Sequence, residues 1–343
     1  MRLAKIIACI IVVYILAAFV PKLETVFNVP VNWPQPHYSF ERNPIDSSKI
    51  YLGRALFYSS LLSRNNKISC ASCHSPYASF AHTDHALSHG IDDKIGSRNA
   101  PALINLAWSN SFMWDGAINH LDMQALFPIT HPLEMDETMQ HVVEKLQVNK
   151  PFPKLFYAAY KDSSITGERV LKSISQFMLS LVSAESKYDS VMRNKSEFTL
   201  QEKNGYRLFK MHCASCHAEP LFTNYTFQNN GLAVDEHLQD LGRMKVTHAA
   251  KDSLKFKVPT LRNIEYTHPY MHDGRFKNLT QVLMHYSSGI TQSSTLANQL
   301  KKDGIPLSPN ERVDITAFLL CLSDKKFIFN PSNAYPKELL FDK

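Results

Sequence analysis

The sequence lacks a cluster of basic residues. Its 37 Lys and Arg residues against 31 Asp and Glu residues give a net charge of only +6, and the positive residues are scattered along the chain. Proteins that bind nucleic acid usually gather such residues on one face or in one segment. We therefore expect no nucleic-acid partner, and the charge supports at most a weakly basic face toward an acidic partner.

Convincing runs of strands are also missing, as are signs of a large disordered or fibrous region. Hydrophobic residues make up 44% of the chain and charged residues 20%, which is an ordinary globular composition. Apolar residues recur near helical spacing in several segments, so the expected fold class is mostly α. These segments are residues 47–62, 137–147, 167–186, 278–289 and 308–324. In the last segment, Ser308 and Glu311 have the pattern of a capping box.

One unbroken apolar run, Ile6 to Val20, follows the positive residues Arg2 and Lys5. This is the outline of an export signal. As a helix the run would be roughly 22 Å long, somewhat less than the roughly 30 Å hydrocarbon core of a bilayer. Residues 1–21 are therefore expected to be either a cleaved signal peptide or a membrane anchor, and the lack of a clean cleavage site favours the anchor. The positive residues place the rest of the chain outside the cytoplasm, in the periplasm.

Cysteine is scarce, with six residues in the chain. Cys9 lies in the apolar run and Cys321 in the apolar segment "AFLLCLS", where a small buried hydrophobe is the better interpretation of each. The other four stand in two copies of "CASCH", at residues 70–74 and 213–217. In haem c, two cysteines at this spacing form thioether bonds to the porphyrin, and the adjacent histidine binds the iron.

The two motifs predict two covalently bound haem c groups. We assign Cys70, Cys73 and His74 to one haem, and Cys213, Cys216 and His217 to the other. The alternatives are a zinc site built from the four cysteines, or two redox dithiols. Zinc ribbons usually place their cysteine pairs much closer, and neither alternative needs both histidines.

The repetition extends beyond the motifs. "PALINLAWSNSFMWDGAINHLDMQAL", from Pro101, aligns without a gap with "PTLRNIEYTHPYMHDGRFKNLTQVL", from Pro259. A length of 343 residues also favours two domains. We expect an internal duplication into two haem domains, residues 35–190 and 191–343, with a charged segment near their boundary.

From about residue 40 the chain resembles the bacterial di-haem cytochrome c peroxidase family, which also contains the MauG-type enzymes. Both haem motifs carry the resemblance, together with "SRNAPALIN", "FMWDGAINHLDMQALFPITHPLEM" and "KVPTLRNIEYTHPYMHDGRFKNLTQVLMHYSSG", in the family's order. The resemblance implies two cytochrome-c-like domains. In that family the N-terminal haem reacts with hydrogen peroxide, and the C-terminal haem receives electrons from a small donor protein such as a cytochrome c or a cupredoxin.

The resemblance also implies roles for residues near the first haem. Glu134 occupies the position of the family's acid-base glutamate, and a carboxylate can take a proton from one peroxide oxygen and return it to the other. Gln124 matches the pocket glutamine that orients peroxide. Trp114 matches the tryptophan that relays electrons between the haems; a core tryptophan is the other interpretation, and both can be true.

A loop histidine closes the first haem in the resting state of some family members. His89 lies at about the right distance, fifteen residues after His74. However, the segment from His89 to Arg98 is about two residues longer than in that subgroup, and His82 and His85 lie nearby. An ordinary loop histidine is the alternative.

The sixth ligand of the second haem decides its chemistry. Methionine stabilises ferrous iron, whereas tyrosinate favours ferric or higher states. Tyr286 stands where the peroxidases have methionine and the MauG-type enzymes have tyrosine. Met271 is the second candidate, and His272 and His285 are weaker ones.

The resemblance implies one calcium ion between the domains. Asn99 would supply its side-chain oxygen, and Thr267 and Pro269 their backbone carbonyls, which are the hard oxygen ligands that calcium prefers. No acidic loop marks this site independently.

The expected activity is reduction of hydrogen peroxide to water with electrons from a small redox protein. One alternative is a MauG-like enzyme that oxidises a side chain of a protein substrate through a high-valent state shared by the two haems. Another is an electron-transfer cytochrome without catalysis. A membrane tether through residues 1–21 and a homodimer are further expectations about assembly.

Overall fold

The computed structural model describes residues 27–301 and 304–337. This part of the chain is mostly helical, as the sequence predicts. The expected signal or anchor segment and Cys9 lie outside the described residues. Among the helices that are described, none is long and apolar enough to cross a membrane.

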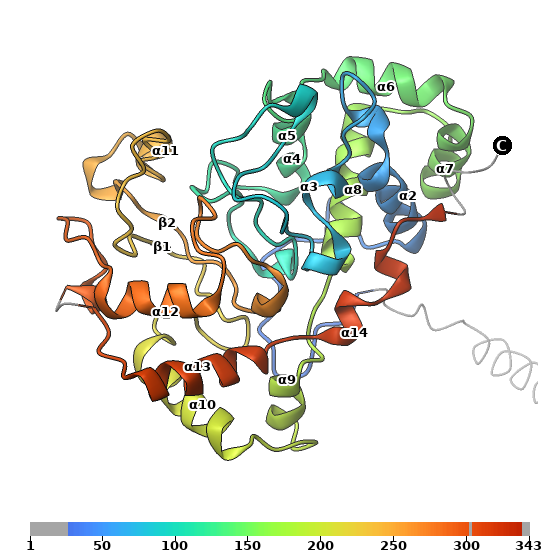
Figure 1. Ribbon diagram of the computed structural model, residues 1–343. Coiled ribbons are helices and arrows are strands. Elements are labelled where there is room, and N and C mark those ends of the chain that lie inside the picture. Colours follow the sequence, from blue (N-terminus) through green and yellow to red (C-terminus); the bar gives the residue numbers. More distant parts are fainter. Residues whose placement is uncertain (1–26, 302–303, 338–343) are drawn as a thin grey trace, which may run out of the picture.

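The elements follow one another along the chain as shown in Figure 1. The α-helices are α2 (Ser47–Tyr58), α3 (Cys70–Cys73), α4 (Leu121–Gln124), α5 (Leu126–Thr130), α6 (Met139–Val148), α7 (Pro151–Tyr160), α8 (Gly167–Ser180), α9 (Lys187–Met192), α10 (Leu200–His212), α11 (Met244–Thr247), α12 (Leu279–Ser288), α13 (Pro309–Leu320) and α14 (Lys325–Ile328). The 3-10 turns are η1 (Ser60–Leu62), η2 (Pro76–Ala78), η3 (Ile91–Asp93), η4 (Leu106–Trp108), η5 (Ala250–Asp252), η6 (Ile264–Tyr266), η7 (Asn298–Leu300) and η8 (Pro331–Asn333). Each segment with helical periodicity contains a helix, namely α2, α6, α8, α12 and α13, so these predictions are confirmed.

Two helix pairs are packed in the same way. In the first half, α2 lies so close to α8 that a Cβ atom on Gly53 would stand 1.8 Å from the carbonyl oxygen of Ser173. In the second half, α10 meets α13 with equal closeness, because a Cβ atom on Gly205 would stand 1.9 Å from the carbonyl oxygen of Asp314. Only glycine permits such an approach of two backbones. Figure 1 shows each pair side by side.

The buried hydrophobic residues form two clusters. One is built mainly from residues between Tyr38 and Leu181, and the other from residues between Tyr188 and Leu322. Helix α14 returns to the first half, since its residues Phe327 and Ile328 belong to the first cluster. Figure 1 shows this segment running back beside the first half.

Residues 27–301 and 304–337 contain little β-strand. β1 (Phe227–Gln228) and β2 (Phe256–Lys257) form an antiparallel pair in which Phe227 lies opposite Lys257. The amide nitrogen of Lys257 also donates to the carbonyl oxygen of Trp114 at 2.7 Å. The pair therefore connects the second half of the chain to a loop of the first.

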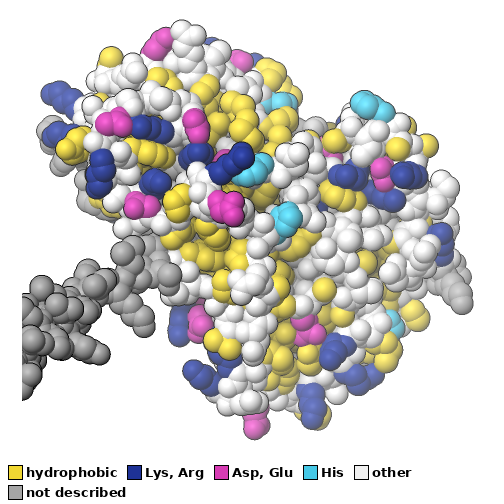
Figure 2. Space-filling model, turned by 180° about the vertical axis from the view of Figure 1, so that it is seen from behind, with side chains coloured by type: hydrophobic (Ala, Val, Ile, Leu, Met, Phe, Trp, Pro, Cys, Tyr) yellow, Lys and Arg dark blue, Asp and Glu magenta, His cyan; other side chains and the backbone are white. Residues whose placement is uncertain are grey.

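The surface carries mixed charge. Figure 2 shows positive and negative side chains interspersed on one face, with hydrophobic side chains between them. This distribution agrees with the scatter of charge along the sequence.

Candidate functional site

The first Cys-x-x-Cys-His motif forms one helical turn and the residue after it. Cys70 and Cys73 are the ends of α3, and both thiols are free and half-buried. The Nδ1 atom of His74 lies 2.7 Å from the carbonyl oxygen of Phe80. Since a carbonyl can only accept, Nδ1 carries the proton and the lone pair of Nε2 is left for another partner. Burial lowers the pKa of His74 to about 4, so the ring is neutral at neutral pH.

The second motif follows α10 directly and repeats this arrangement. The thiols of Cys213 and Cys216 are free. The Nδ1 atom of His217 lies 3.2 Å from the carbonyl oxygens of both Phe222 and Pro259, which again leaves Nε2 for a ligand bond. Burial lowers the pKa of His217 to about 4.

Both motifs have the donor set that haem c requires. Each offers two free thiols on one turn and a neutral histidine held by its Nδ1 proton. In the part of the chain that the structure describes, no three or more His, Cys, Asp or Glu side chains are grouped to hold a metal ion. The fifth free thiol, that of Cys321, is buried as expected.

Glu134 lies beside the first motif, in the loop between α5 and α6. Its side chain is 31% exposed. Burial raises the pKa of Glu134 to about 7. Burial also raises the pKa of Cys73 to about 11, and the Glu134 carboxylate adds to this increase because it lies nearby. The carboxyl group can therefore exist in either protonation state near neutral pH.

The loop that carries His89 packs against Glu134. Its backbone approaches so closely that a Cβ atom on Gly90 would lie 2.0 Å from the carbonyl oxygen of Leu133. The carbonyl oxygen of His89 accepts a hydrogen bond from the thiol of Cys73 at 3.3 Å. The structure thus brings the predicted gate residue, the predicted acid-base residue and the first motif together.

The His89 side chain belongs to a short row of histidines. Its ring stacks on that of His85 at a centroid distance of 4.1 Å, and the ring of His85 lies 5.6 Å from that of His82. The Nδ1 atom of His82 is buried and has no hydrogen-bond partner among the described residues. The row places polar ring nitrogens along the loop after the first motif.

Gln124 and Trp114 are connected through Met113. Gln124 ends α4, and its amide lies 3.9 Å from the Met113 sulfur. The indole nitrogen of Trp114 donates to the carbonyl oxygen of Asn99 at 2.8 Å, and its own carbonyl oxygen accepts from Lys257. Trp114 is thus held where the two halves of the chain meet.

The two main ligand candidates for the second haem share one neighbour. The amide of Asn230 donates to the Met271 sulfur at 3.3 Å. Burial raises the pKa of Tyr286 to about 12, with a hydrogen bond from Asn230 opposing the increase and the thiols of Cys213 and Cys216 adding to it. These influences place the Tyr286 hydroxyl close to the second motif.

The other histidine candidates have different contacts. The ring of His272 stacks on Phe256 at a centroid distance of 3.6 Å. The Nε2 atom of His285 lies 2.9 Å from the carbonyl oxygen of Asn230. Since that bond occupies Nε2, this nitrogen of His285 is not free for iron.

Asn99, the first predicted calcium ligand, also lies between the halves. Its side-chain nitrogen donates to the carbonyl oxygen of Ala86 at 2.9 Å, and its backbone nitrogen to that of His272 at 2.7 Å. His272 follows Pro269 by three residues, so the segment with Thr267 and Pro269 runs toward Asn99.

Sequence reasoning missed several residues that hold these groups. Asn230 contacts the ligand candidate Met271, and Lys257 contacts Trp114. Neither residue belongs to a recognisable sequence motif. Arg98 stands in the segment "SRNAPALIN", which carries the family resemblance, and this could have drawn attention to it.

Two covalent haem sites on a helical fold define a di-haem c-type cytochrome. The family model for di-haem cytochrome c peroxidase matches residues 47–197. The methylamine utilization protein MauG of Methylorubrum extorquens (strain AM1) is 35% identical over 309 residues, covering 87% of this chain and 83% of that protein. The cytochrome c551 peroxidase of Nitrosomonas europaea is 35% identical over 246 residues, 70% of this chain and 73% of the relative.

A solved structure agrees with these relatives. The crystal structure of a MauG-like protein associated with microbial copper homeostasis superposes with a TM-score of 0.82 at 28% identity, covering 90% of this chain and 99% of that one. The chain belongs to the di-haem cytochrome c peroxidase family, which includes the MauG proteins. Membership implies two c-type haems, and the donor atoms of both motifs fit them.

Proposed function

We propose that the protein is a di-haem c-type peroxidase that reduces hydrogen peroxide to water with electrons from a small redox protein. Cys70, Cys73 and His74 would hold the peroxidatic haem, and the second motif would hold the electron-transfer haem. When bound, a haem supplies redox-active iron for cleaving the O–O bond. The observation that carries the proposal is the Glu134 carboxyl group, with its pKa of about 7, beside the first motif.

Glu134 supplies the proton transfer that peroxide reduction needs. The balanced reaction joins one hydrogen peroxide, two electrons and two protons to give two waters. The carboxylate takes a proton from one peroxide oxygen and delivers it to the other as the O–O bond breaks. Gln124 would orient the peroxide by hydrogen bonds from its amide, and the His89 loop would control access to the same space.

Trp114 and Tyr286 complete the electron path in this proposal. Trp114 would relay electrons between the haems, which its position between the two halves supports. Tyr286 would bind the second iron, supported by its proximity to Cys213 and Cys216. A cytochrome c or a cupredoxin would be the external donor.

A MauG-like activity is the second candidate function. Tyr286 as the ligand of the second haem would favour it, because an anionic ligand stabilises oxidised iron. Relatives named MauG at 35% and 32% identity also support it. The substrate would then be a side chain of another protein, oxidised at the expense of peroxide.

The domain organisation belongs to the same proposal. We divide the chain into domains 35–190 and 191–343 that arose by duplication. The matching glycine contacts of Gly53 and Gly205 support this, as do the matching left-handed conformations of Met113 (φ 67°) and Met271 (φ 77°). Calcium bound by Asn99, Thr267 and Pro269 would tie the domains together. Residues 1–21 would direct the chain to the periplasm as a signal peptide or an anchor, and two copies would form a homodimer.

Glu134→Gln tests the proposed function. In the di-haem protein, with peroxide and a reduced cytochrome c, we expect the rate to fall by about 10²- to 10⁴-fold. Glu144→Gln is the matched control, because Glu144 is exposed on α6, where it accepts a hydrogen bond from Gln140. Full activity of the Glu134 variant would assign the proton transfer to another group, whereas no peroxide reduction by either the wild type or the variant would favour an electron-transfer cytochrome.

A further inference from the structure

The loop that carries Trp114 is held from the second half of the chain. Lys257 donates to it twice: its backbone nitrogen to the carbonyl oxygen of Trp114 at 2.7 Å, and its ammonium to the carbonyl oxygen of Ser111 at 2.6 Å. The ammonium also lies 5.7 Å from the centre of the Phe112 ring. These three contacts of Lys257 all fall on residues 111–114.

Arg243 adds a contact from the same part of the second half. Its guanidinium donates to the carbonyl oxygen of Asp115 at 3.0 Å and lies 3.9 Å from the centre of the Phe227 ring. Gly116 ends the loop with φ 73°, and a Cβ atom there would lie 2.4 Å from Phe227. The loop thus ends in a close contact between its glycine and the second half.

A buried ion pair crosses the same boundary. Arg98, from the first half, lies 2.6 Å from the carboxylates of both Asp115 and Asp240. The side chain of Asp240 is only 2% exposed, and the Arg98 guanidinium holds the pKa of this carboxyl well below its usual range. Removing one partner from such a buried pair costs much more than removing a surface pair, so the contact resists separation.

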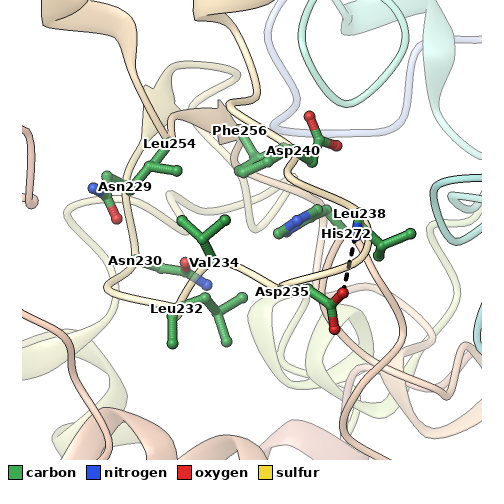
Figure 3. Close-up of a pocket in the computed structure, with 11 residues that line it drawn as sticks. Asn229, Asn230, Leu232, Val234, Asp235, Leu238, Asp240, Leu254, Phe256 and His272 are labelled. Atoms are coloured by element: carbon green, nitrogen blue, oxygen red, sulfur yellow. Dashed lines mark hydrogen bonds between the residues drawn. The ribbon is translucent and has the colours of Figure 1, made fainter.

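The space beside this contact is almost filled. A cavity of about 10 Å³ is lined by residues that include Asn230, Asp240, Phe256 and His272, which is room for about one water molecule. Figure 3 shows Asp240, Phe256 and His272 around it. A cavity of this size admits no side chain of a partner, so the two halves are closely packed here.

We propose that Lys257 is a positioning residue for Trp114, which holds residues 111–115 against the second half and thereby sets the rate of electron transfer between the haems. The inference rests on the relay role proposed for Trp114. Lys257 is suited to this task because its side chain spans the boundary, whereas its neighbour Lys255 is paired with Asp252 of its own half at 3.5 Å. A displacement of about 1 Å in such a positioned group can cost about 100-fold in rate.

Lys257→Met tests this inference in the di-haem protein. The methionine keeps most of the aliphatic packing and loses the ammonium that binds Ser111. A flash-excited flavin with a sacrificial electron donor reduces one haem without peroxide, and the transfer of the electron to the other haem is followed by absorbance. We expect the transfer to slow by at least about tenfold, with unchanged spectra of both haems. Lys255→Met removes the same charge two residues away and is expected to leave the rate within about twofold.

A double-mutant comparison separates positioning from general loosening of the fold. In a Trp114→Phe background, Lys257→Met should slow the transfer no further, because the residue it positions is gone. Hydrogen exchange at the Lys257 amide should quicken in the single variant while the helices keep their protection. If Lys257→Met fails to take up haem, Arg243→Met breaks the bond to Asp115 in the same loop and is expected to slow the same transfer.

Two results would overturn the inference: an unchanged rate in the Lys257 variant, or a slowing of equal size when Trp114 is already phenylalanine. Because no peroxide is used, the outcome is independent of peroxidase activity. A Trp114-dependent slowing in a protein without peroxidase activity would refute the proposed function and support the role of Lys257. Normal peroxidase activity of the wild type, together with an unchanged transfer rate in the Lys257→Met variant, would refute only the role of Lys257.

Discussion

The backbone nitrogen of Ile91 donates to the carbonyl oxygen of Glu134 at 2.7 Å. This bond joins the loop that carries His89 to the residue proposed as acid and base. A change in the position of the loop therefore acts directly on the position of the carboxyl group. With the roles proposed for His89 and Glu134, we expect access to the first haem and proton transfer beside it to be coupled through this backbone bond.

Gly90→Ala should disturb this coupling. The new methyl group would lie 2.0 Å from the carbonyl oxygen of Leu133, so one of the two backbones must move. We expect a loss of about 1–3 kcal/mol of stability from overpacking, together with a lower kcat/KM for peroxide. In the control, Gly96→Ala, the methyl group meets the Ser88 hydroxyl, which can rotate away. Equal kinetics in the Gly90 variant and the wild type would contradict the coupling.

Peroxide reduction should depend on pH through Glu134. The carboxyl group must be ionised to take the first proton, and burial raises its pKa to about 7. We therefore expect kcat/KM to fall as the pH drops below about 7, and the Glu134→Gln variant to lack this decrease. The pH profile of the holoenzyme with saturating donor measures it. An identical acid limb in the variant would assign that titration to another group.

The same group affects stability in the opposite sense. The pKa of Glu134 is higher in the folded protein than in the unfolded chain, so the folded state binds more protons between pH 4.5, the ordinary pKa of a glutamate, and about pH 7. Stability from this group is complete below pH 4.5 and is lost as the pH rises through 7. Glu134→Gln should therefore raise the Tm at pH 8 and change it little at pH 4.5. Thermal unfolding of the wild type and the variant at pH 4.5 and pH 8 measures these changes in Tm.

Arg262 should be among the residues that stabilise the fold most. Its side chain is fully buried, forms two hydrogen bonds to Asp189 at 2.8 and 2.9 Å, and lies 4.6 Å from the Trp33 ring. Arg262→Met leaves the Asp189 carboxylate buried without its partner, which costs about 3–5 kcal/mol. Arg64→Met is the matched control, because Arg64 also binds two carboxylates but is about half exposed. Urea unfolding should show a much smaller loss of stability in the Arg64 variant than in the Arg262 variant, because exposed ion pairs contribute little. Comparable losses in the two variants would contradict the argument.

Local patterns in the sequence predicted local structure well. The segments with apolar residues at helical spacing contain α2, α6, α8, α12 and α13, and the capping box of Ser308 and Glu311 is present. Helix α10 was missed because polar residues dominate it and only Gly205, Leu208 and Phe209 are buried. The capping box of Thr199 and Glu202 was the signal that could have revealed it.

Contacts between distant segments were harder to predict. Nothing local marks Lys257 as a partner of Trp114, or α14 as part of the first hydrophobic cluster, because both depend on how the halves pack. The family resemblance is confirmed, and it suggested candidate site residues that hydrophobic periodicity could not. It named Glu134 and Trp114, and their roles remain predictions. The residues that position them became visible only in three dimensions.

The second haem should reveal its ligand when Tyr286 and Met271 are changed separately. We expect Tyr286→Phe to alter the absorption and EPR spectra of that haem and to raise its potential, because an anionic ligand that favours ferric iron is lost. On the same assignment, Met271→Leu should leave both unchanged, because the Met271 sulfur, which accepts from Asn230, is not a ligand of the iron. For the wild-type ferric protein given one equivalent of hydrogen peroxide, a change at both haems without prior reduction would then support the MauG-like second candidate function over the proposed peroxidase. A spectral change in the Met271 variant instead, with reaction only after one electron is added, would reverse the assignment and favour a peroxidase closed by His89.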